Sequence, residues 1–116
     1  MTITRRKALA AGISYGTGCL HFGNDSIVYN RELRKLPADT TYQQLRAALE
    51  NADLEAAKTD VKKLSELCSK MALSEAFMAL KPVQEAIDED ALPAVEEFDD
   101  FGAECGRVID YLEHVA

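Results

Sequence analysis

Residues 53–71, DLEAAKTDVKKLSELCSKM, decide the fold class of this chain. Their apolar members recur at steps of three and four residues, at Leu54, Ala57, Val61, Leu64, Cys68 and Met71. This spacing places them on one face of an α-helix, and it is typical of a helix packed lengthwise against others. Asp53, directly before the first apolar residue, is a favourable N-cap. The stretch therefore predicts a long amphipathic helix with a polar outer face.

The residues upstream predict a second long helix and several short ones. Thr40 precedes the long helix and forms a capping-box pattern with Gln43. The apolar face of this helix consists of Tyr42, Leu45 and Leu49. Farther upstream we expect short helical segments over residues 4–11, 13–22 and 25–36, delimited by Gly12, Gly23, a cap at Asn24 or Asp25, and Pro37. Ile27, Tyr29, Leu33 and Leu36 are the apolar candidates of the third segment.

Two further amphipathic helices are expected downstream. Ser74 is the predicted N-cap of the first, and Pro82 within it predicts a kink or a restart. Its apolar stripe is Phe77, Leu80, Val83 and Ile87. Pro93 suits the first turn of the last helix. The apolar positions of that helix are Val95, Phe98, Phe101 or Gly102, Cys105, Ile109, Leu112 and Val115.

The length of the chain and the size of its loops indicate how these helices are arranged. The chain has 116 residues, of which 47% are hydrophobic and 28% charged, a composition that suits one globular domain with its own core. The predicted turns at residues 51–52 and 90–91 are short and force neighbouring helices to run antiparallel. We therefore predict an all-α, up-down antiparallel four-helix bundle with short N-terminal helices. The domain spans residues 1–116 and its core bundle about residues 25–115.

Charge is distributed unevenly along the chain, whose net charge is −7. Residues 85–116 carry one basic and eleven acidic residues, whereas residues 1–84 carry twelve basic and nine acidic residues. Because phosphate binding needs a cationic footprint, the acidic third disfavours nucleic acid as a partner. We expect the acidic run of residues 88–100 to be a solvated helix face. The alternative is a docking surface for a basic partner or a divalent cation.

The cysteines indicate a cellular compartment. Cys19, Cys68 and Cys105 are odd in number and lack the spacing of a metal site, which predicts reduced thiols packed as small hydrophobes in the cytoplasm. The alternative is export, because a basic triplet at residues 5–7 precedes a mildly apolar stretch, although three glycines interrupt that stretch. No run approaches the roughly 20 apolar residues of a membrane helix.

No motif for phosphate binding, hydrolysis or metal ligation occurs in the sequence. His21 and His114 have no ligand partner one helical turn away, so neither a metal nor a cofactor is predicted. We expect His114 to be a solvated residue near the helix C-terminus and His21 to be an incidental surface or turn residue. The lysines of residues 58–70 are expected to form a solvated face rather than a phosphate site.

Two local strings and the order of elements resemble the histidine-containing phosphotransfer (HPt) domains of bacterial phosphorelays. Residues 45–57, LRAALENADLEAA, are similar to the family string LRxALExGDLEA. Residues 11–25, AGISYGTGCLHFGND, are similar to a family segment ending GLxRFGG, and a tyrosine follows at position 29. The resemblance covers about residues 8–114. It implies a four-helix bundle that acts in phosphorelay signalling.

The sequence departs from the family at the phosphorylation site. The phosphorylated histidine of the family falls on Lys62, the lysine of the same motif on Ser65, and the glycine that makes room for a receiver domain on Glu66. A later family glycine falls on Ala72. A lysine amine is mostly protonated near neutral pH and is then a poor nucleophile, and Glu66 would repel a phosphoaspartate. The resemblance therefore implies docking without phosphate transfer.

The leading hypothesis is a non-catalytic, HPt-like interaction module that docks a receiver domain or a histidine kinase. Lys62 should be exposed and point toward the partner, while Leu64 is buried. The residues expected around Lys62 in the docking surface are Lys58, Ser65, Glu66 and Ser69. One alternative is a structural or self-associating bundle without a signalling role, and another is an active phosphotransfer protein that uses His21. The sequence predicts no enzyme activity, cofactor, metal or membrane partner, and no particular oligomeric state.

Overall fold

The computed structural model describes residues 3–115, and all regular elements in this range are helical. Three short helices open the chain: α1 (Arg5–Ala10), α2 (Tyr15–His21) and α3 (Ser26–Leu33). The 3₁₀ turn η1 (Leu36–Ala38) leads into four longer helices: α4 (Thr41–Glu50), α5 (Leu54–Lys70), α6 (Ser74–Asp88) and α7 (Val95–Val115). The predicted all-α class is confirmed.

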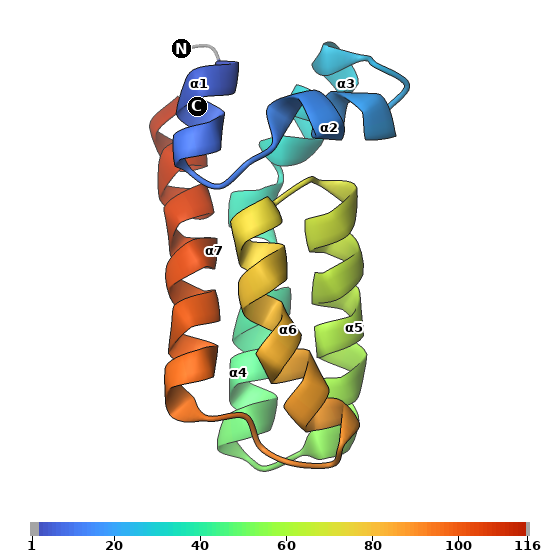
Figure 1. Ribbon diagram of the computed structural model, residues 1–116, viewed down its shortest axis with the longest axis vertical. Coiled ribbons are helices and arrows are strands. Elements are labelled where there is room, and N and C mark those ends of the chain that lie inside the picture. Colours follow the sequence, from blue (N-terminus) through green and yellow to red (C-terminus); the bar gives the residue numbers. More distant parts are fainter. Residues whose placement is uncertain (1–2, 116) are drawn as a thin grey trace.

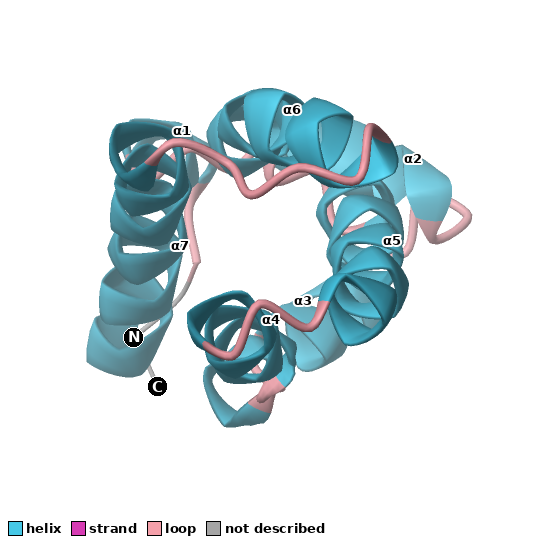
Figure 2. Ribbon diagram, turned by 90° about the horizontal axis from the view of Figure 1, so that it is seen from below, coloured by secondary structure: helices cyan, strands magenta, loops and turns pink. Residues whose placement is uncertain are grey.

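The four longer helices pack in chain order, α4 against α5, α5 against α6, and α6 against α7. They lie along the long axis of the molecule, and successive helices run in opposite directions (Figure 1). Viewed along that axis, they surround a common interior (Figure 2). The short helices α1, α2 and α3 gather at one end (Figure 1). This packing is that of a helical bundle, as the short turns predict.

The three turns of the bundle share one backbone design. Each contains a non-glycine residue in the left-handed region, with φ of 53° at Ala52, 58° at Ala72 and 59° at Asp90. In each turn the next amide bonds back to a carbonyl of the last helical turn, as in the 2.8 Å bond from Asp53 N to Ala48 O. This arrangement is the Schellman motif, which ends a helix and reverses the chain.

The caps of the first two bundle helices differ in how well the sequence predicts them. Asp53 caps α5 as expected, since its carboxylate accepts a hydrogen bond from Ala56 N at 3.2 Å. Thr40 is the N-cap residue of α4, as predicted, but its side chain makes no capping hydrogen bond, so the capping box itself is wrong. Asp39 instead accepts from Thr41 N at 2.9 Å, and the Thr40 hydroxyl accepts from the side-chain amide of Gln44 at 3.2 Å. An aspartate one residue upstream has replaced the threonine as the local acceptor.

Two expectations for the second half of the bundle need correction, at Ser74 and at Pro93. Ser74 is not the cap of α6 but its first residue, and its hydroxyl is hydrogen-bonded to the hydroxyl of Ser14. Of the two alternatives predicted at Pro82, the restart does not occur, since α6 continues through this residue. Pro93 lies before the last helix, which begins only at Val95. Pro93 thus lies in the loop before the last helix rather than in its first turn.

The N-terminal helices share one hydrophobic core with the bundle. Ile3, Ala8 and Ile13 are buried in the same cluster as the apolar stripes of the long helices. Tyr29 of α3 is fully buried, and its hydroxyl donates a hydrogen bond of 2.6 Å to the carbonyl of Met71. This contact ties the short helices to the end of α5.

The tyrosine anchor depends on a glycine. A Cβ atom on Gly18 would lie 2.0 Å from the ring of Tyr29, closer than any side chain permits. Gly18 is therefore required for the close approach of α2 to α3. Tyr15 adds a tilted ring contact to Tyr29 with centroids 5.3 Å apart.

Two apolar residues predicted to lie on buried faces are exposed. Ile27 retains 72% of its surface because it lies opposite Tyr29 and Leu33 on α3, about 200° away around the helix for a spacing of two residues. Val95 retains 75% because it begins α7 beyond the packed part of that helix. The buried stripe of α7 includes Val108, which the sequence analysis had not placed there.

Candidate functional site

The helix α5 carries all of the docking residues predicted from the sequence. Lys62, Glu66 and Ser69 are exposed, and Lys58 and Ser65 are half-buried. The opposite face consists of the buried residues Ala57, Val61, Leu64 and Cys68. The predicted phase of the helix is thus confirmed, with Lys62 outside and Leu64 inside; Leu54, at the start of the seam, is only half-buried. We name Lys58, Lys62, Ser65, Glu66 and Ser69 the α5 face.

One end of the α5 face is fixed by an ion pair. The ammonium of Lys58 donates a hydrogen bond to the carboxylate of Asp90, in the turn that leaves α6. This bond raises the pKa of the Lys58 ammonium. The side chain of Lys62 has no hydrogen bond or ion pair with any residue of the described range 3–115, and the same holds for the side chain of Glu66. The middle of the face is therefore free to meet a partner.

His21 lies beside the other end of α5, a position that was not predicted. Its Nδ1 is 3.1 Å from the carbonyl oxygen of Lys70, the last residue of α5. A carbonyl only accepts hydrogen bonds, so this contact assigns the neutral imidazole the tautomer with the proton on Nδ1 and the lone pair on Nε2. The side chain is exposed, as expected for a surface residue, although His21 is the last residue of α2 rather than part of a turn. The ammonium of Lys70 lies over the ring of Phe22, 5.5 Å from its centroid.

His114 has a different environment at the C-terminal end of α7. Its Nδ1 is 2.6 Å from the carbonyl oxygen of Asp110 and 3.5 Å from the carboxylate of the same residue. These contacts raise the pKa of the imidazole, the backbone hydrogen bond contributing most. His114 is exposed, as predicted for a solvated residue at a helix C-terminus.

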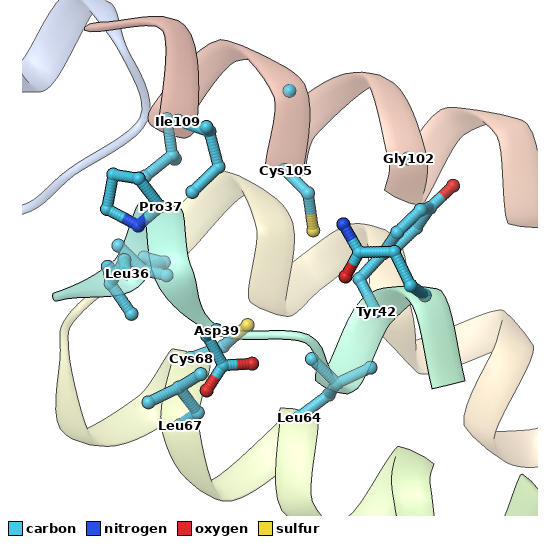
Figure 3. A pocket seen from close by; sticks show the side chains of 14 residues that line it. Leu36, Pro37, Asp39, Tyr42, Leu64, Leu67, Cys68, Gly102, Cys105 and Ile109 are labelled. Atoms are coloured by element: carbon cyan, nitrogen blue, oxygen red, sulfur yellow. The ribbon is translucent and has the colours of Figure 1, made fainter. Parts of the chain in front are cut away.

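A pocket between the start of α4 and the middle of α7 was not predicted. It has a volume of about 270 Å³. Its lining residues are Leu36, Pro37, Asp39, Tyr42, Gln43, Leu64, Leu67, Cys68, Leu73, Gly102, Cys105, Gly106, Val108 and Ile109. We name it the α4–α7 pocket. The thiols of Cys68 and Cys105 point into it from opposite helices (Figure 3).

Burial distinguishes the floor of this pocket from its mouth. Leu36, Leu64, Cys68, Leu73 and Val108 are buried and form the floor, whereas Pro37, Asp39, Gln43 and Gly106 are exposed and form the mouth. Burial raises the pKa of both pocket thiols to about 12. They are therefore neutral thiols at physiological pH, in agreement with the prediction that the cysteines pack as small hydrophobes.

A sequence signal for the pocket exists in α7, although it is weak. Gly102, Cys105 and Gly106 are small residues at a spacing that puts them on one side of the helix. A Cβ atom on Gly102 would lie 2.4 Å from the hydroxyl of Tyr42, so that glycine admits the tyrosine. A Cβ atom on Gly106 would meet nothing within 4 Å, so this second glycine leaves a hollow.

The acidic run of residues 88–100 lies around the α6–α7 loop and the first turns of α7, and most of it is exposed. No group of three or more histidine, cysteine, aspartate or glutamate side chains in residues 3–115 is arranged to hold a metal ion. The same range contains no helix that is long and apolar enough to cross a membrane.

Comparison with known proteins does not assign the chain to a family. The chain matches no protein-family model, and no curated protein or solved structure shows significant similarity to it.

Proposed function

We propose that this chain is a non-catalytic interaction module, similar to HPt domains, that docks a receiver domain or a histidine kinase through the α5 face. The observation that carries the proposal is the position of Lys62. It is exposed near the middle of a bundle helix, unpaired with any residue in 3–115, and it occupies the place that the resemblance gives to the phosphorylated histidine. An ammonium there suits the acidic phosphorylation pocket of a receiver domain.

The turn after α5 is compatible with one position of the resemblance. The resemblance aligns a family glycine with Ala72, and Ala72 has a φ of 58°. Glycine is the residue that adopts this left-handed conformation without steric cost. The backbone conformation would therefore explain a glycine at this place in an HPt domain. It agrees with the alignment of the end of α5 that the resemblance implies.

Chemistry at the α5 face opposes phosphate transfer there. None of Lys58, Lys62, Ser65, Glu66 and Ser69 offers a neutral imidazole nitrogen. A protonated lysine has no lone pair with which to attack phosphorus, and the carboxylate of Glu66, one turn away, repels a phosphoryl group. The face can attract an acidic surface, but it cannot accept its phosphate.

A binding titration tests this proposal. Purified receiver domains and histidine-kinase domains from the same organism are titrated against the chain by calorimetry. We expect saturable binding of at least one of them, weakened by about tenfold or more in Lys62→Glu because an attraction becomes a repulsion. The matched control is Lys81→Glu, the same charge change at an exposed position of α6. Absence of binding, or equal weakening by both variants, would contradict the proposal.

His21 supports a second candidate function, active phosphotransfer from the end of α5. Its Nδ1 is held by the carbonyl of Lys70, which leaves the lone pair of Nε2 available as a nucleophile. In such a reaction Nε2 would bond to phosphorus while the bond to the aspartyl oxygen of a phosphorylated receiver breaks. Acid-labile phosphate on the wild-type chain that is lost in His21→Ala but kept in His114→Ala would favour this function. Its absence would leave the docking proposal standing alone.

A further inference from the structure

We propose that the α4–α7 pocket is a binding site for a small cationic aromatic molecule of about two fused rings. The pocket lies on the inner side of α5, across the helix from Lys62, so this inference does not depend on the α5 face or on a protein partner. It rests on the size of the pocket, the chemistry of its walls, the charge at its mouth and the glycine that keeps it open.

The size of the pocket sets the size of the ligand. A buried apolar cavity of about 150 Å³ is large enough to bind benzene. The α4–α7 pocket has about 270 Å³, and it reaches from the surface down to the buried residues Leu64 and Leu73. A fused two-ring system can therefore enter ring-first and occupy its depth. Pockets between the helices of a bundle are a common location for such ligands.

The walls of the pocket favour an apolar ligand over water. An ordered water needs two to four polar partners. The floor offers aliphatic side chains and the thiol of Cys68, which remains neutral because burial raises its pKa. Water in this space is poorly satisfied, and its replacement by an apolar ring is favourable. The ring of Tyr42 and the sulfur of Cys105 add contacts that suit an aromatic surface.

The mouth of the pocket selects the charge of the ligand. Asp39 is the only charged residue among those that line it. One carboxylate oxygen of Asp39 accepts the hydrogen bond of Thr41 N, which leaves the other oxygen for a ligand. Lys35 and Arg107, each adjacent in sequence to a residue that lines the pocket, are paired with Glu32 at 3.1 Å and with Glu104 at 3.3 Å. An ammonium beside the ring would therefore be attracted to the mouth, and a carboxylate would be repelled.

Gly106 keeps the entrance open. It is exposed, it lines the pocket, and a Cβ atom there would meet nothing within 4 Å. A Cβ atom can thus be added at this position without displacing any neighbour, and a larger side chain can extend from it. This gives a variant that closes the entrance while the fold is retained.

Three probes with one ring system and different charges test the proposal: naphthylmethylamine, naphthylmethanol and naphthoate. The chain has no tryptophan, so naphthalene fluorescence can be followed directly. We expect saturable one-to-one binding with affinity in the order amine, alcohol, carboxylate. The amine should exceed the carboxylate by about tenfold, since an exposed charge contact changes affinity by up to about fivefold and here attraction is replaced by repulsion. In Asp39→Asn, which keeps the acceptor for Thr41 N, the three affinities should converge.

Two leucine substitutions on α7 separate the pocket from nonspecific binding. Gly106→Leu should abolish binding of the amine, whereas Ala103→Leu, which adds the same side chain at an exposed position outside the lining, should leave it unchanged. Circular dichroism checks that both variants are folded. Absence of saturable binding by folded wild-type protein would overturn the proposal. So would binding that is equal for all three probes, or that survives Gly106→Leu.

Discussion

The seam between α5 and α6 and the seam between α4 and α7 are built differently. The first joins helices that a short turn connects, and it is filled by fully buried side chains such as Val61, Leu80 and Val83. The second joins the first and last helices of the bundle, which no turn connects. There Tyr42 reaches across to α7, stacking on Phe98 with centroids 5.4 Å apart, and a pocket remains beside it.

This difference shows what closes a helical bundle. A short turn holds consecutive helices side by side, so their apolar stripes pack together whichever side chains they contain. The first and last helices meet only where particular side chains reach across, and small residues at that seam leave space. Gly102 and Gly106 are four residues apart on α7. The space beside Gly102 is occupied by the side chain of Tyr42, whereas Gly106 lies beside the open pocket.

The largest expected effect contrasts the two seams by truncating one leucine in each. Leu80→Ala should lower the free energy of unfolding by about 2–5 kcal/mol, as large-to-small core substitutions do. Leu64→Ala should cost less, because the side chain of Leu64 already borders the pocket and loses fewer contacts. Urea denaturation of both variants measures this difference. Equal losses would mean that the α4–α7 seam is as closed as the other.

The exposed side of α5 provides the control for that comparison. Lys62→Ala should change the free energy of unfolding by no more than about 0.5 kcal/mol, since Lys62 is exposed and unpaired with any residue in the described range. A loss comparable with that of Leu64→Ala would mean that the rotation of α5 about its axis is wrong.

Alkaline pH should destabilise the protein through the pocket thiols. Burial raises the pKa of Cys68 and Cys105 from 9.0 to about 12. Between these values the unfolded chain loses thiol protons that the folded chain retains, so stability is fully present below pH 9 and falls as pH rises. Each thiol can contribute a slope of up to about 1.4 kcal/mol per pH unit. The raised pKa of Tyr29 acts in the same direction at higher pH.

The measurement for this prediction is urea denaturation at a series of pH values from neutral to alkaline. Cys68→Ala should make the decline shallower than in the wild-type chain, even though the substitution itself lowers stability. A decline of unchanged slope would show that the thiol already ionises in the folded protein.

Two glycines on one helix give the smallest and sharpest contrast. Gly106→Ala should raise the free energy of unfolding by up to about 1 kcal/mol, because alanine is the better helix former and its Cβ meets no atom within 4 Å. Gly102→Ala has the same gain in propensity but must displace the hydroxyl of Tyr42, a crowding cost of about 1–3 kcal/mol. Thermal unfolding should therefore rank Gly106→Ala above Gly102→Ala. The reverse order would contradict the described approach of Tyr42 to α7.

The sequence predicted what local rules determine. The apolar spacing of α5 gave its buried face, and Asp53 gave its start, because both depend only on residues within the helix. Thr40 is the N-cap of α4 as predicted but makes no side-chain capping bond, since Asp39 accepts from Thr41 N instead. The cap predicted at Ser74 was wrong, because Ser74 is the first residue of α6 and its hydroxyl is bonded to that of Ser14. Which of several acceptors is used depends on neighbours that the sequence pattern does not rank.

The candidate sites divide in the same way. The exposure of Lys62 followed from the helix phase. The α4–α7 pocket and the position of His21 beside Lys70 did not, because both arise from segments about 50 or more residues apart or from the joint shape of several helices. A pocket forms where neighbouring side chains leave space unfilled, and the pattern of apolar residues along the sequence does not predict where this occurs.

The most direct test of the proposed function is an amide chemical-shift titration of the isotope-labelled chain with a receiver domain that binds it. The account predicts shifts concentrated on exposed residues of α5, around Lys62 and Glu66. It also predicts that residues at the mouth of the α4–α7 pocket, such as Gly106, are unaffected. Shifts centred on the α4–α7 seam, with the α5 face unchanged, would contradict it.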